Sequence, residues 1–254
     1  MKIRILGCGT SSGVPRIGND WGQCDPHEPR NRRTRVSALI ETASTRILID
    51  TGPDLREQLN AADVATVDAI IWTHDHADHT HGIDDVRQLF HNGGGPVRGL
   101  ARQDTMAALR DRFGYVFTGG QGYRPTATIE VLEDDVTIGD IRIRTVDQPH
   151  GTITSAGLRF EHDGRSIVYS TDFNVLTPMM QSMYEDCDLW IADALREDPH
   201  PSHPHLSATL DWVEALRVQR AVLIHMDNSM DYVTLASRLP GHVEPGYDGL
   251  EVAV

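Results

Sequence analysis

Short apolar runs separated by glycine, proline and polar clusters make up most of the chain. Lys2 to Leu6 alternates apolar and charged side chains, as a half-buried strand does, and it runs into a glycine-rich loop over residues 7–15. β-Branched side chains on both sides of Ala43-Ser44 predict a hairpin of two strands, Val36 to Glu41 and Thr45 to Asp50. The chain is therefore expected to begin as a small sheet.

The rest of the chain alternates between strand patterns and helical spacing. Helices are predicted at Leu55 to Ala61, Asp84 to Phe90, Gln103 to Phe113, Pro178 to Met183 and Ser207 to Leu216. Strands are predicted at Ala69 to Thr73, Thr128 to Leu132, Val136 to Ile138, Ile141 to Val146, Thr154 to Glu161, Ser166 to Ser170, Leu189 to Ala192 and Arg220 to Ile224. Strands on both sides of helical stretches indicate an α/β fold with two mixed β-sheets flanked by helices.

Length and composition are those of a globular domain. The 254 residues suit a single domain over residues 1–254, with 39% hydrophobic and 24% charged residues. No apolar run reaches the ~18 residues needed to cross a bilayer, and the start does not resemble a signal peptide. Three scattered cysteines favour a reducing compartment over a disulfide framework. We therefore expect a cytoplasmic protein without membrane contact.

The net charge and the histidine content indicate which ligands the protein can bind. The formal net charge is −14, which disfavours nucleic acid, because its binding depends on Lys and Arg at the phosphates. Bound divalent cations would offset part of this charge locally. The 13 histidines are the unusual feature of the composition, and they direct attention to metal sites.

A dense group of candidate metal ligands follows the apolar run that ends at Thr73. The residues are His74-Asp75-His76-Ala77-Asp78-His79. Residues two apart in a turning backbone can reach one ion, while the next pair turns toward a second ion ~3.5–4 Å away. Imidazole and carboxylate together suit zinc, manganese or iron better than calcium or magnesium. A polar helix start capped by the aspartates is the alternative, and it gives the three histidines no role.

Single residues at other predicted strand ends can complete a site for two ions. These residues are His150, Asp172 and His225, which follow strands ending at Val146, Ser170 and Ile224. Each residue alone is more typical of an ordinary surface position. Together, and at the same sheet edge as the histidine group, they favour a binuclear metal site.

The order His-x-His-x-Asp-His, then a distant His, an Asp and a last His, resembles the metallo-β-lactamase superfamily over nearly the whole chain. The resemblance implies an αββα sandwich with two metal ions at one edge of its two sheets. It implies that His74, His76 and His150 bind one ion and that Asp78, His79 and His225 bind the other. It also implies that Asp172 bridges the ions, which is similar to phosphodiesterases, glyoxalase II and tRNase Z and differs from the zinc β-lactamases.

Motifs near both ends of the chain resemble one particular type of enzyme within this superfamily. The opening Gly7 to Pro15, the pair Trp21-Gly22 and the closing Gly246 to Glu251 are similar to PhnP-type cyclic phosphodiesterases of bacterial phosphonate breakdown. That type has a structural zinc site built from a cysteine cluster after Trp-Gly and a histidine soon after the last metal histidine. Here only Cys24, with His27 as a further candidate, is available. We predict that this second site holds no metal.

The resemblance implies that the two ions lower the pKa of a bridging water, whose hydroxide attacks phosphorus. Asp78 is expected to bind metal and orient that water, and Asp75 to accept a hydrogen bond from a ligand imidazole. A general acid must also protonate the leaving oxygen. His205, just before Leu-Ser, is the preferred candidate, His203 is the alternative, and a loop in which both are solvated is the third case.

The run Arg30 to Arg35 is the densest positive patch. Its arginines could hold an anionic substrate through contacts to phosphate oxygens. Ion pairs with an acidic surface are the more common role of such a run.

We expect a metal-dependent hydrolase, specifically a phosphodiesterase whose partner is a small anionic phosphate ester, cyclic esters included. A nuclease for tRNA 3′ ends is the nearest alternative, and the charge of −14 argues against it. A second alternative is a hydrolase that acts on a thioester, a lactone or, weakly, a β-lactam, because the same hydroxide can attack a carbonyl carbon. A non-catalytic metal-binding scaffold is the remote alternative. The oligomeric state stays open, with a homodimer as one possibility.

Overall fold

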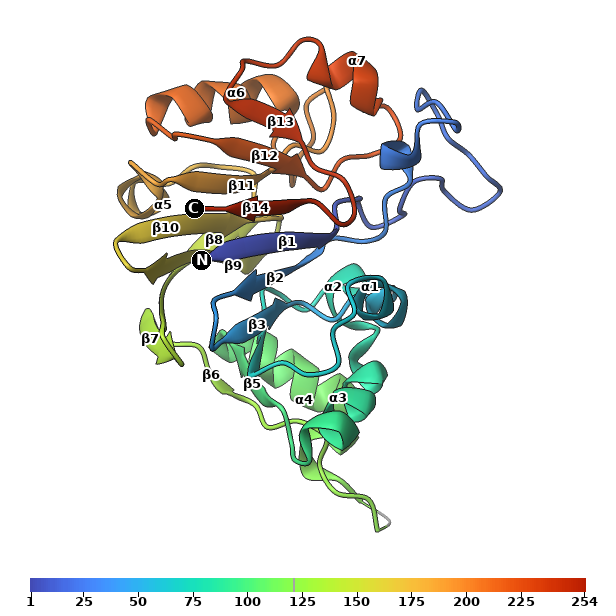
Figure 1. Ribbon diagram of the computed structural model, residues 1–254, viewed down its shortest axis with the longest axis vertical. Coiled ribbons are helices and arrows are strands. Elements are labelled where there is room, and N and C mark those ends of the chain that lie inside the picture. Colours follow the sequence, from blue (N-terminus) through green and yellow to red (C-terminus); the bar gives the residue numbers. More distant parts are fainter. Residues whose placement is uncertain (121) are drawn as a thin grey trace.

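Two stacked β-sheets form the centre of the molecule, with helices on the outer faces (Figure 1). The computed structural model describes residues 1–120 and 122–254. Each sheet has seven strands, in the orders β14-β1-β2-β3-β4-β5-β6 and β13-β12-β11-β10-β9-β8-β7. The predicted α/β sandwich of two mixed sheets flanked by helices is confirmed.

The first sheet combines an antiparallel half with a parallel half. Its strands are β1 (Lys2–Gly7), β2 (Ser37–Glu41), β3 (Arg46–Ile49), β4 (Ala69–Trp72), β5 (Arg98–Ala101), β6 (Glu130–Val131) and β14 (Glu251–Ala253). Neighbours are antiparallel from β14 to β3 and parallel from β3 to β6. The parallel half therefore places the carboxyl ends of β3 and β4 side by side.

The second sheet repeats this division. Its strands are β7 (Asp135–Ile138), β8 (Ile141–His150), β9 (Ile153–His162), β10 (Arg165–Ser170), β11 (Leu189–Asp193), β12 (Ala221–Ile224) and β13 (Val243–Pro245). Neighbours are antiparallel from β7 to β10 and parallel from β10 to β13. The carboxyl ends of β10, β11 and β12 consequently share one edge.

Alternation along the strands decides which face each side chain covers. Ile49 of β3 and Ile71 of β4 belong to the core between the sheets, which Phe160 of the second sheet helps to fill. Leu48 and Ile70, one position earlier, belong to the separate core under the helices of the first sheet. Both faces of the first sheet are thus buried, which holds the strand ends rigidly.

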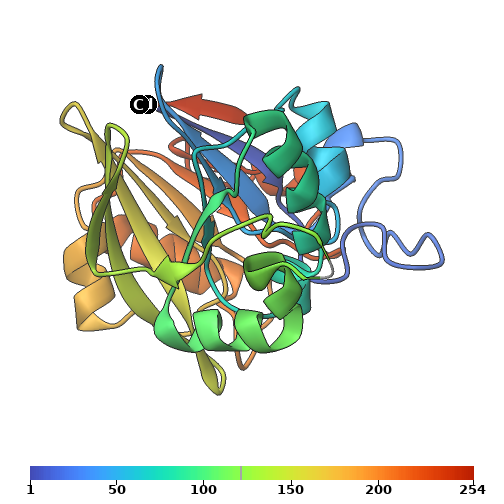
Figure 2. The same cartoon turned by 90° about the horizontal axis from the view of Figure 1, so that it is seen from below.

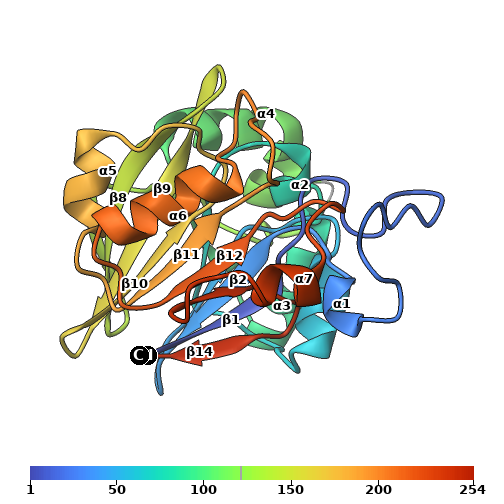
Figure 3. The same cartoon turned by 90° about the horizontal axis from the view of Figure 1, so that it is seen from above.

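Helices cover the outer faces of the sandwich (Figures 2 and 3). On the first sheet they are α1 (Leu55–Ala61), α2 (Ala77–Thr80), η2 (Ile83–Asp85), α3 (Val86–Gly93) and α4 (Gln103–Thr118). On the second sheet they are α5 (Pro178–Tyr184), α6 (Leu206–Ala215) and α7 (Tyr232–Ala236). The short helix η1 (Pro29–Asn31) lies in the irregular segment between β1 and β2, residues 8–36, here called the N-terminal excursion. None of the helices in the described residues has the length and hydrophobicity needed to cross a membrane.

The structure differs from the predicted elements at several boundaries, since α4 continues past Phe113 to Thr118 and β6 is limited to Glu130–Val131. Two further differences concern whole elements and the position of a candidate ligand. The strands β5, β13 and β14 and the short helices α2, α7, η1 and η2 are additional. Strand β8 does not end at Val146 but continues to His150, and the pairing with β9 runs through Pro149 to the register His150↔Ile153. His150 is therefore the last residue of a strand and not part of the following loop.

Candidate metal centre

Strand ends from both sheets meet at one edge of the sandwich. β4 leads into the segment His74 to His79, and β8 ends at His150 itself. In the second sheet, β10 leads to Asp172 and β12 leads to His225. Segments far apart in the sequence thus deliver all seven predicted ligands to one place.

Three of the polar residues that follow strands adopt a left-handed backbone conformation. The φ angle is +63° at Asp50, +56° at Asp172 and +59° at His225. Residues other than glycine rarely adopt such angles, and those that persist concentrate at functional sites. Here the sharp turn ends the strand, and all three side chains are buried.

The predicted ligands form two neighbouring groups. The first contains His74, His76, His150 and Asp172, and the second contains Asp78, His79 and His225, with the ligand atoms of a group within 4.8 Å of one another. His76 is exposed, whereas the other four histidines are buried. These are the two sets that the resemblance assigns to two ions. The sequence analysis thus anticipates this convergence, while the role of each side chain as a ligand stays a prediction.

Asp172 lies between the two groups. Its Oδ1 atom is 3.8 Å from Nε2 of His74 and 3.6 Å from Nε2 of His150. The same carboxylate reaches Nε2 of His79 at 3.2 Å and Nε2 of His225 at 3.5 Å. A carboxylate within reach of both groups is suited to bridge two cations.

Several buried ring nitrogens at this edge lack a hydrogen-bond partner among the described residues. They are Nε2 of His74 and His79 and both ring nitrogens of His225. A buried polar atom without a partner costs about 1–3 kcal/mol, so their gathering in one place calls for another kind of partner. Imidazole nitrogens beside carboxylates fit divalent metal ions, which such a donor set implies.

Burial and opposite charges determine the proton affinity of the cluster. Burial lowers the pKa of His74 well below its usual value. Burial also disfavours the charged form of His225. The carboxylates of Asp172 and Asp193 outweigh this effect of burial and raise the pKa of His225 to about 9. Burial would raise the pKa of Asp172, yet the surrounding imidazoles hold it well below its usual range. The centre therefore keeps a carboxylate ionised in a buried place, as cation binding requires.

Asp50 is a buried residue that contacts the centre and that the sequence pattern did not reveal. Its Oδ2 atom lies 2.7 Å from Nδ1 of His79 and accepts a hydrogen bond from Thr73 Oγ1 at 2.8 Å. Its Oδ1 atom accepts from the Thr73 backbone N–H at 2.7 Å. Burial raises the pKa of Asp50, an effect that His79 opposes. Asp50 thereby fixes the His79 ring with Nε2 turned toward Asp172.

Asp75 does not take the role expected from the sequence. Its carboxylate forms an ion pair with Arg112 of α4 instead of accepting from a ligand imidazole. The physical reason is its position, because α4 brings a guanidinium to the outer side of the loop. The expectation for Asp75 is therefore wrong, and Asp50, in the loop after β3, contacts a histidine ring of the centre instead.

The two candidate general acids differ in their surroundings. His203 Nδ1 lies 2.9 Å from Oδ2 of Asp193, and its Nε2 lies 3.8 Å from Oδ1 of Asp172. Its ring stacks on His225 with centroids 4.7 Å apart. His205 is the residue before α6, and the described residues offer its side chain no hydrogen bond or ion pair with the centre. Geometry therefore favours His203, the alternative of the sequence analysis, over His205.

Asp193, the last residue of β11, is the second residue that the sequence pattern did not reveal. Its Oδ2 atom accepts from the Asp172 backbone N–H at 2.9 Å as well as contacting His203. One buried carboxylate therefore positions a bridging candidate and an acid candidate together. Only its place at the end of a buried strand, beside those of Asp172 and His225, was visible in the sequence.

The arginine run serves the fold. Arg30 pairs with Glu28 at 2.7 Å, and Arg35 pairs with Asp54 at 2.8 Å. Arg33 is buried and donates to the backbone carbonyl of Asp227 at 3.1 Å. The contacts of Arg30 and Arg35 agree with the ion-pair role of the run, whereas Arg33 binds backbone carbonyls.

The surroundings of Cys24 differ from a metal site. Its Sγ atom lies 3.9 Å from Nη1 of the buried Arg33, and His27 is exposed. Within residues 1–120 and 122–254, the groups of candidate metal ligands do not include Cys24. Burial also raises the pKa of the Cys8 thiol well above its usual value, which keeps this thiol protonated.

Comparison with known proteins identifies relatives of different length. A family model described as "Beta-lactamase superfamily domain" matches residues 45–226. An octanoyltransferase of Porphyromonas gingivalis (strain ATCC BAA-308 / W83) is 31% identical to this chain. The match includes 100% of this chain and 52% of the octanoyltransferase. The exodeoxyribonuclease WalJ of Streptococcus pneumoniae is 25% identical over 62% of this chain and 57% of its own. The chain spans about half the length of these curated relatives.

A solved structure matches over its full length. It is described as a new diphosphatase from the PhnP family, with a TM-score of 0.90 and 31% identity over 100% of this chain and 97% of that chain. The predicted similarity to the PhnP type is thereby confirmed. With the family model covering most of the chain and the histidine and aspartate groups in place at the sheet edge, this chain belongs to the metallo-β-lactamase superfamily.

Proposed function

We propose that the protein is a binuclear metal-dependent phosphodiesterase that acts on small anionic phosphate esters, cyclic esters included. The observation that carries the proposal is the pair of ligand groups joined by Asp172. Full-length similarity to a PhnP-family diphosphatase supports chemistry at phosphorus rather than at carbonyl carbon. The donor set is compatible with zinc, manganese or iron.

The protein's own residues supply orientation and a proton. When bound, divalent ions lower the pKa of a coordinated water and polarise phosphate oxygens. Asp193 accepts a hydrogen bond from His203 Nδ1, which leaves Nε2 facing the centre. In the doubly protonated ring, the Nε2 proton can pass to the leaving oxygen, which leaves a neutral imidazole with its proton on Nδ1. Asp78, whose pKa the neighbouring imidazoles hold low against its desolvation, can accept from the attacking water and orient it.

A matched pair of variants tests the general acid. His203→Ala should lower kcat about 100-fold on a diester with a poor alkoxide leaving group and much less on a p-nitrophenyl diester. His205→Ala, two residues away, is the control and should retain kcat on both substrates. Metal content, measured by elemental analysis, should stay unchanged in both variants. Full activity of His203→Ala on the alkoxide substrate would show that another group donates the proton.

A substrate profile tests the reaction class. A nuclease is the nearest alternative, since the relatives include an exodeoxyribonuclease, but a charge of −14 opposes binding of a polyanion. Metal-loaded protein is assayed on bis(p-nitrophenyl) phosphate, a ribosyl cyclic phosphate, a tRNA precursor, a lactone, a glutathione thioester and a β-lactam. We expect turnover of the first two. Faster turnover of RNA or of a carbonyl substrate would overturn the proposal.

We also propose that the chain forms one domain and works in a reducing compartment such as the cytoplasm. All three cysteines are buried and free. The two sheets share one core, to which residues from Ile3 to Val252 contribute. Limited proteolysis that released a stable fragment would contradict the single domain.

A further inference from the structure

A further histidine, His200, lies beside the candidate metal centre and is not one of the candidate ligands among the described residues. It belongs to the loop between β11 and α6, residues 194–205, here called the acid loop because it also carries His203. The half-buried ring of His200 is tilted against that of His203, with the two centroids 5.2 Å apart. A molecule that contacts His203 can therefore extend to His200 as well.

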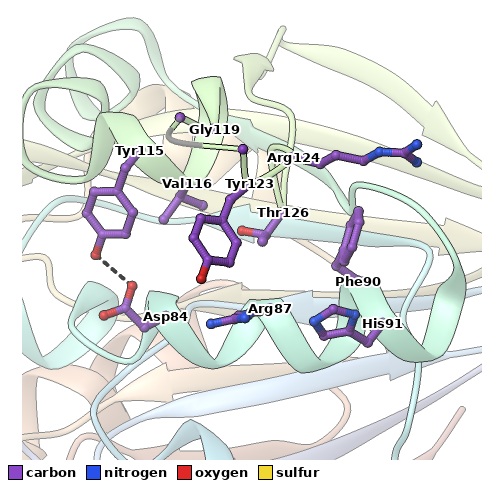
Figure 4. A pocket seen from close by; sticks show the side chains of 12 residues that line it. Asp84, Arg87, Phe90, His91, Tyr115, Val116, Gly119, Tyr123, Arg124 and Thr126 are labelled. Atoms are coloured by element: carbon purple, nitrogen blue, oxygen red, sulfur yellow. Dashed lines mark hydrogen bonds between the residues drawn. The ribbon is translucent and has the colours of Figure 1, made fainter.

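Segments of both sheets border the centre. On the side of the first sheet, α4 contacts the residues that carry and follow the histidine motif. Arg112 pairs with Asp75, and the Tyr115 hydroxyl donates a hydrogen bond to Asp84 at 2.6 Å (Figure 4). These four polar side chains thus have partners within the protein. On the side of the second sheet, the border is the acid loop, and a leaving group that takes a proton from His203 must lie against it.

The acid loop is restrained by its prolines and by hydrogen bonds. Pro199, Pro201 and Pro204 each fix one φ angle of the loop. Nδ2 of Asn174 donates to the Pro201 carbonyl at 2.9 Å, and the Leu195 N–H donates to the Pro204 carbonyl at 3.1 Å. A binding group on a restrained loop loses little conformational entropy when a ligand arrives. The acid loop is therefore suited to hold a side chain ready for a substrate.

The backbone of Ser202 connects His200 to a predicted metal ligand and fixes the tautomers of both rings. Its carbonyl oxygen accepts from Nδ1 of His150 at 2.9 Å, and its N–H donates to Nδ1 of His200 at 3.3 Å. Because a backbone N–H can only donate, Nδ1 of His200 is the acceptor, and the neutral ring carries its proton on Nε2. Burial and the neighbouring His203 lower the pKa of His200, which favours this neutral ring.

The Nε2–H group of His200 is available to a bound molecule. The hydrogen bonds of His200 within the described part of the chain engage Nδ1, through the N–H and the hydroxyl of Ser202, and leave Nε2 without a partner. A neutral N–H group is a donor for an oxygen acceptor such as an ether or a hydroxyl. Its place beside His203 puts this donor on the side of the leaving group.

We propose that His200 binds the substrate, with its Nε2–H donating to a second oxygen of the leaving group, next to the oxygen that His203 protonates. The proposal rests on the proposed phosphodiesterase function and specifies the substrate class of that centre. Preferred esters carry an ether or hydroxyl oxygen in the leaving group, close to the bond that breaks.

Two chromogenic diesters test the proposal, methyl 2-methoxy-4-nitrophenyl phosphate and methyl 2-ethyl-4-nitrophenyl phosphate. Their leaving groups have the same shape, but an ether oxygen in the first replaces a methylene group in the second. We expect metal-loaded wild-type enzyme to favour the methoxy ester about fivefold in kcat/KM, the effect of one neutral hydrogen bond. His200→Ala should abolish this preference, mainly by raising KM for the methoxy ester. His200→Gln retains an N–H donor and should restore part of it.

A matched control and a measurement independent of turnover complete the experiment. His162→Ala removes another half-buried histidine, at the end of β9 opposite to its pairing with His150, and should leave the preference unchanged. Long-range ¹H–¹⁵N NMR of the Zn²⁺-loaded protein reports the tautomer of each neutral histidine. The signals that disappear in His200→Gln should be those of a neutral ring protonated on Nε2.

A proton on Nδ1 of His200 would overturn the proposed contact, as would equal effects of His200→Ala on both esters or no effect on either. These outcomes leave the phosphodiesterase function in place, because the wild-type enzyme still turns over both esters. If the wild-type enzyme turned over neither ester, the phosphodiesterase function would be refuted, and the proposed substrate contact with it.

Discussion

Asp50 illustrates how a buried carboxylate can fix the orientation of an imidazole that we propose as a metal ligand. Its contact of 2.7 Å with Nδ1 of His79 leaves Nε2 as the ring atom that faces Asp172. Partners of this kind fix the ring orientation and increase the basicity of the ligand nitrogen. The residue lies in the loop after β3, so the first sheet contributes two adjacent strand ends to the centre.

We predict that Asp50→Asn weakens metal affinity 10–100-fold, because the neutral amide orients and polarises His79 less well. Asp75→Asn is the matched control, since the Asp75 carboxylate contacts Arg112 away from the rings. Competition with a chromophoric metal indicator measures both affinities. An equal loss in the two variants would contradict the role assigned to Asp50.

The sequence predicts the candidate ligands, whereas it does not predict the residues that position them. Histidines two and five positions apart after an apolar strand are a recognisable pattern, and His150, Asp172 and His225 follow it in order. Asp50 and Asp193 are single aspartates at strand ends, and nothing near them in the sequence indicates an imidazole partner. His203 and His205 are two residues apart in one loop, so only the fold decides which ring stacks on His225.

Among the elements, the segment of α2 and η2 is held against the loop after β3 by backbone contacts. The Thr51 N–H donates to the His79 carbonyl at 2.8 Å, and the Gly82 N–H donates to the Thr51 carbonyl at 2.8 Å. A Cβ atom on Gly82 would collide with the carbonyl oxygen of Gly52. Glycine at position 82 therefore allows the close approach that positions both Asp50 and His79.

We predict that Gly82→Ala lowers the free energy of unfolding by ~1–3 kcal/mol and weakens metal binding, because the collision moves η2 away from the loop. Gly114→Ala is the matched control, because a Cβ there meets no atom within 4 Å inside α4. That variant should be neutral or stabilising by up to ~1 kcal/mol. Urea unfolding of the metal-free proteins compares them, and equal stabilities would refute the close-approach argument.

Long, strongly patterned elements are predicted well from the sequence, and short ones are not. β5 contains Gly99, a residue that disfavours strands, yet a Cβ atom at this position would collide with the ring of Trp72. β8 continues through Pro149 because its pairing with β9 outweighs the local preference. In both cases a neighbour distant in the sequence decides the structure, so local patterns could not show it.

At the scale of the whole molecule, the metal-free centre links stability to pH. The pKa of His225 is about 9 in the folded protein, above the usual value of ~6.5. Protonation of His225 therefore stabilises the metal-free fold fully below pH 6.5, and this contribution disappears as the pH rises through 9. His79, whose pKa the carboxylates raise against the effect of burial, acts in the same direction.

We predict that Tm of the metal-free protein falls by a few degrees between pH 6.5 and 9, on the order of 2 kcal/mol of stability. Protein loaded with Zn²⁺ or Mn²⁺ should show a smaller fall, because metal and proton compete for the same nitrogens. Scanning calorimetry at several pH values measures both curves. Parallel curves with and without metal would contradict this linkage.

The buried guanidinium of Arg33 gives the N-terminal excursion a permanent internal cation. It donates to the backbone carbonyls of Asp227 and Met230, just beyond the strand end that carries His225. An arginine stays charged at every physiological pH and cannot be extracted by a chelator. This cross-link between the segment that follows β1 and the segment that follows β12 therefore does not depend on whether the histidine centre holds a metal.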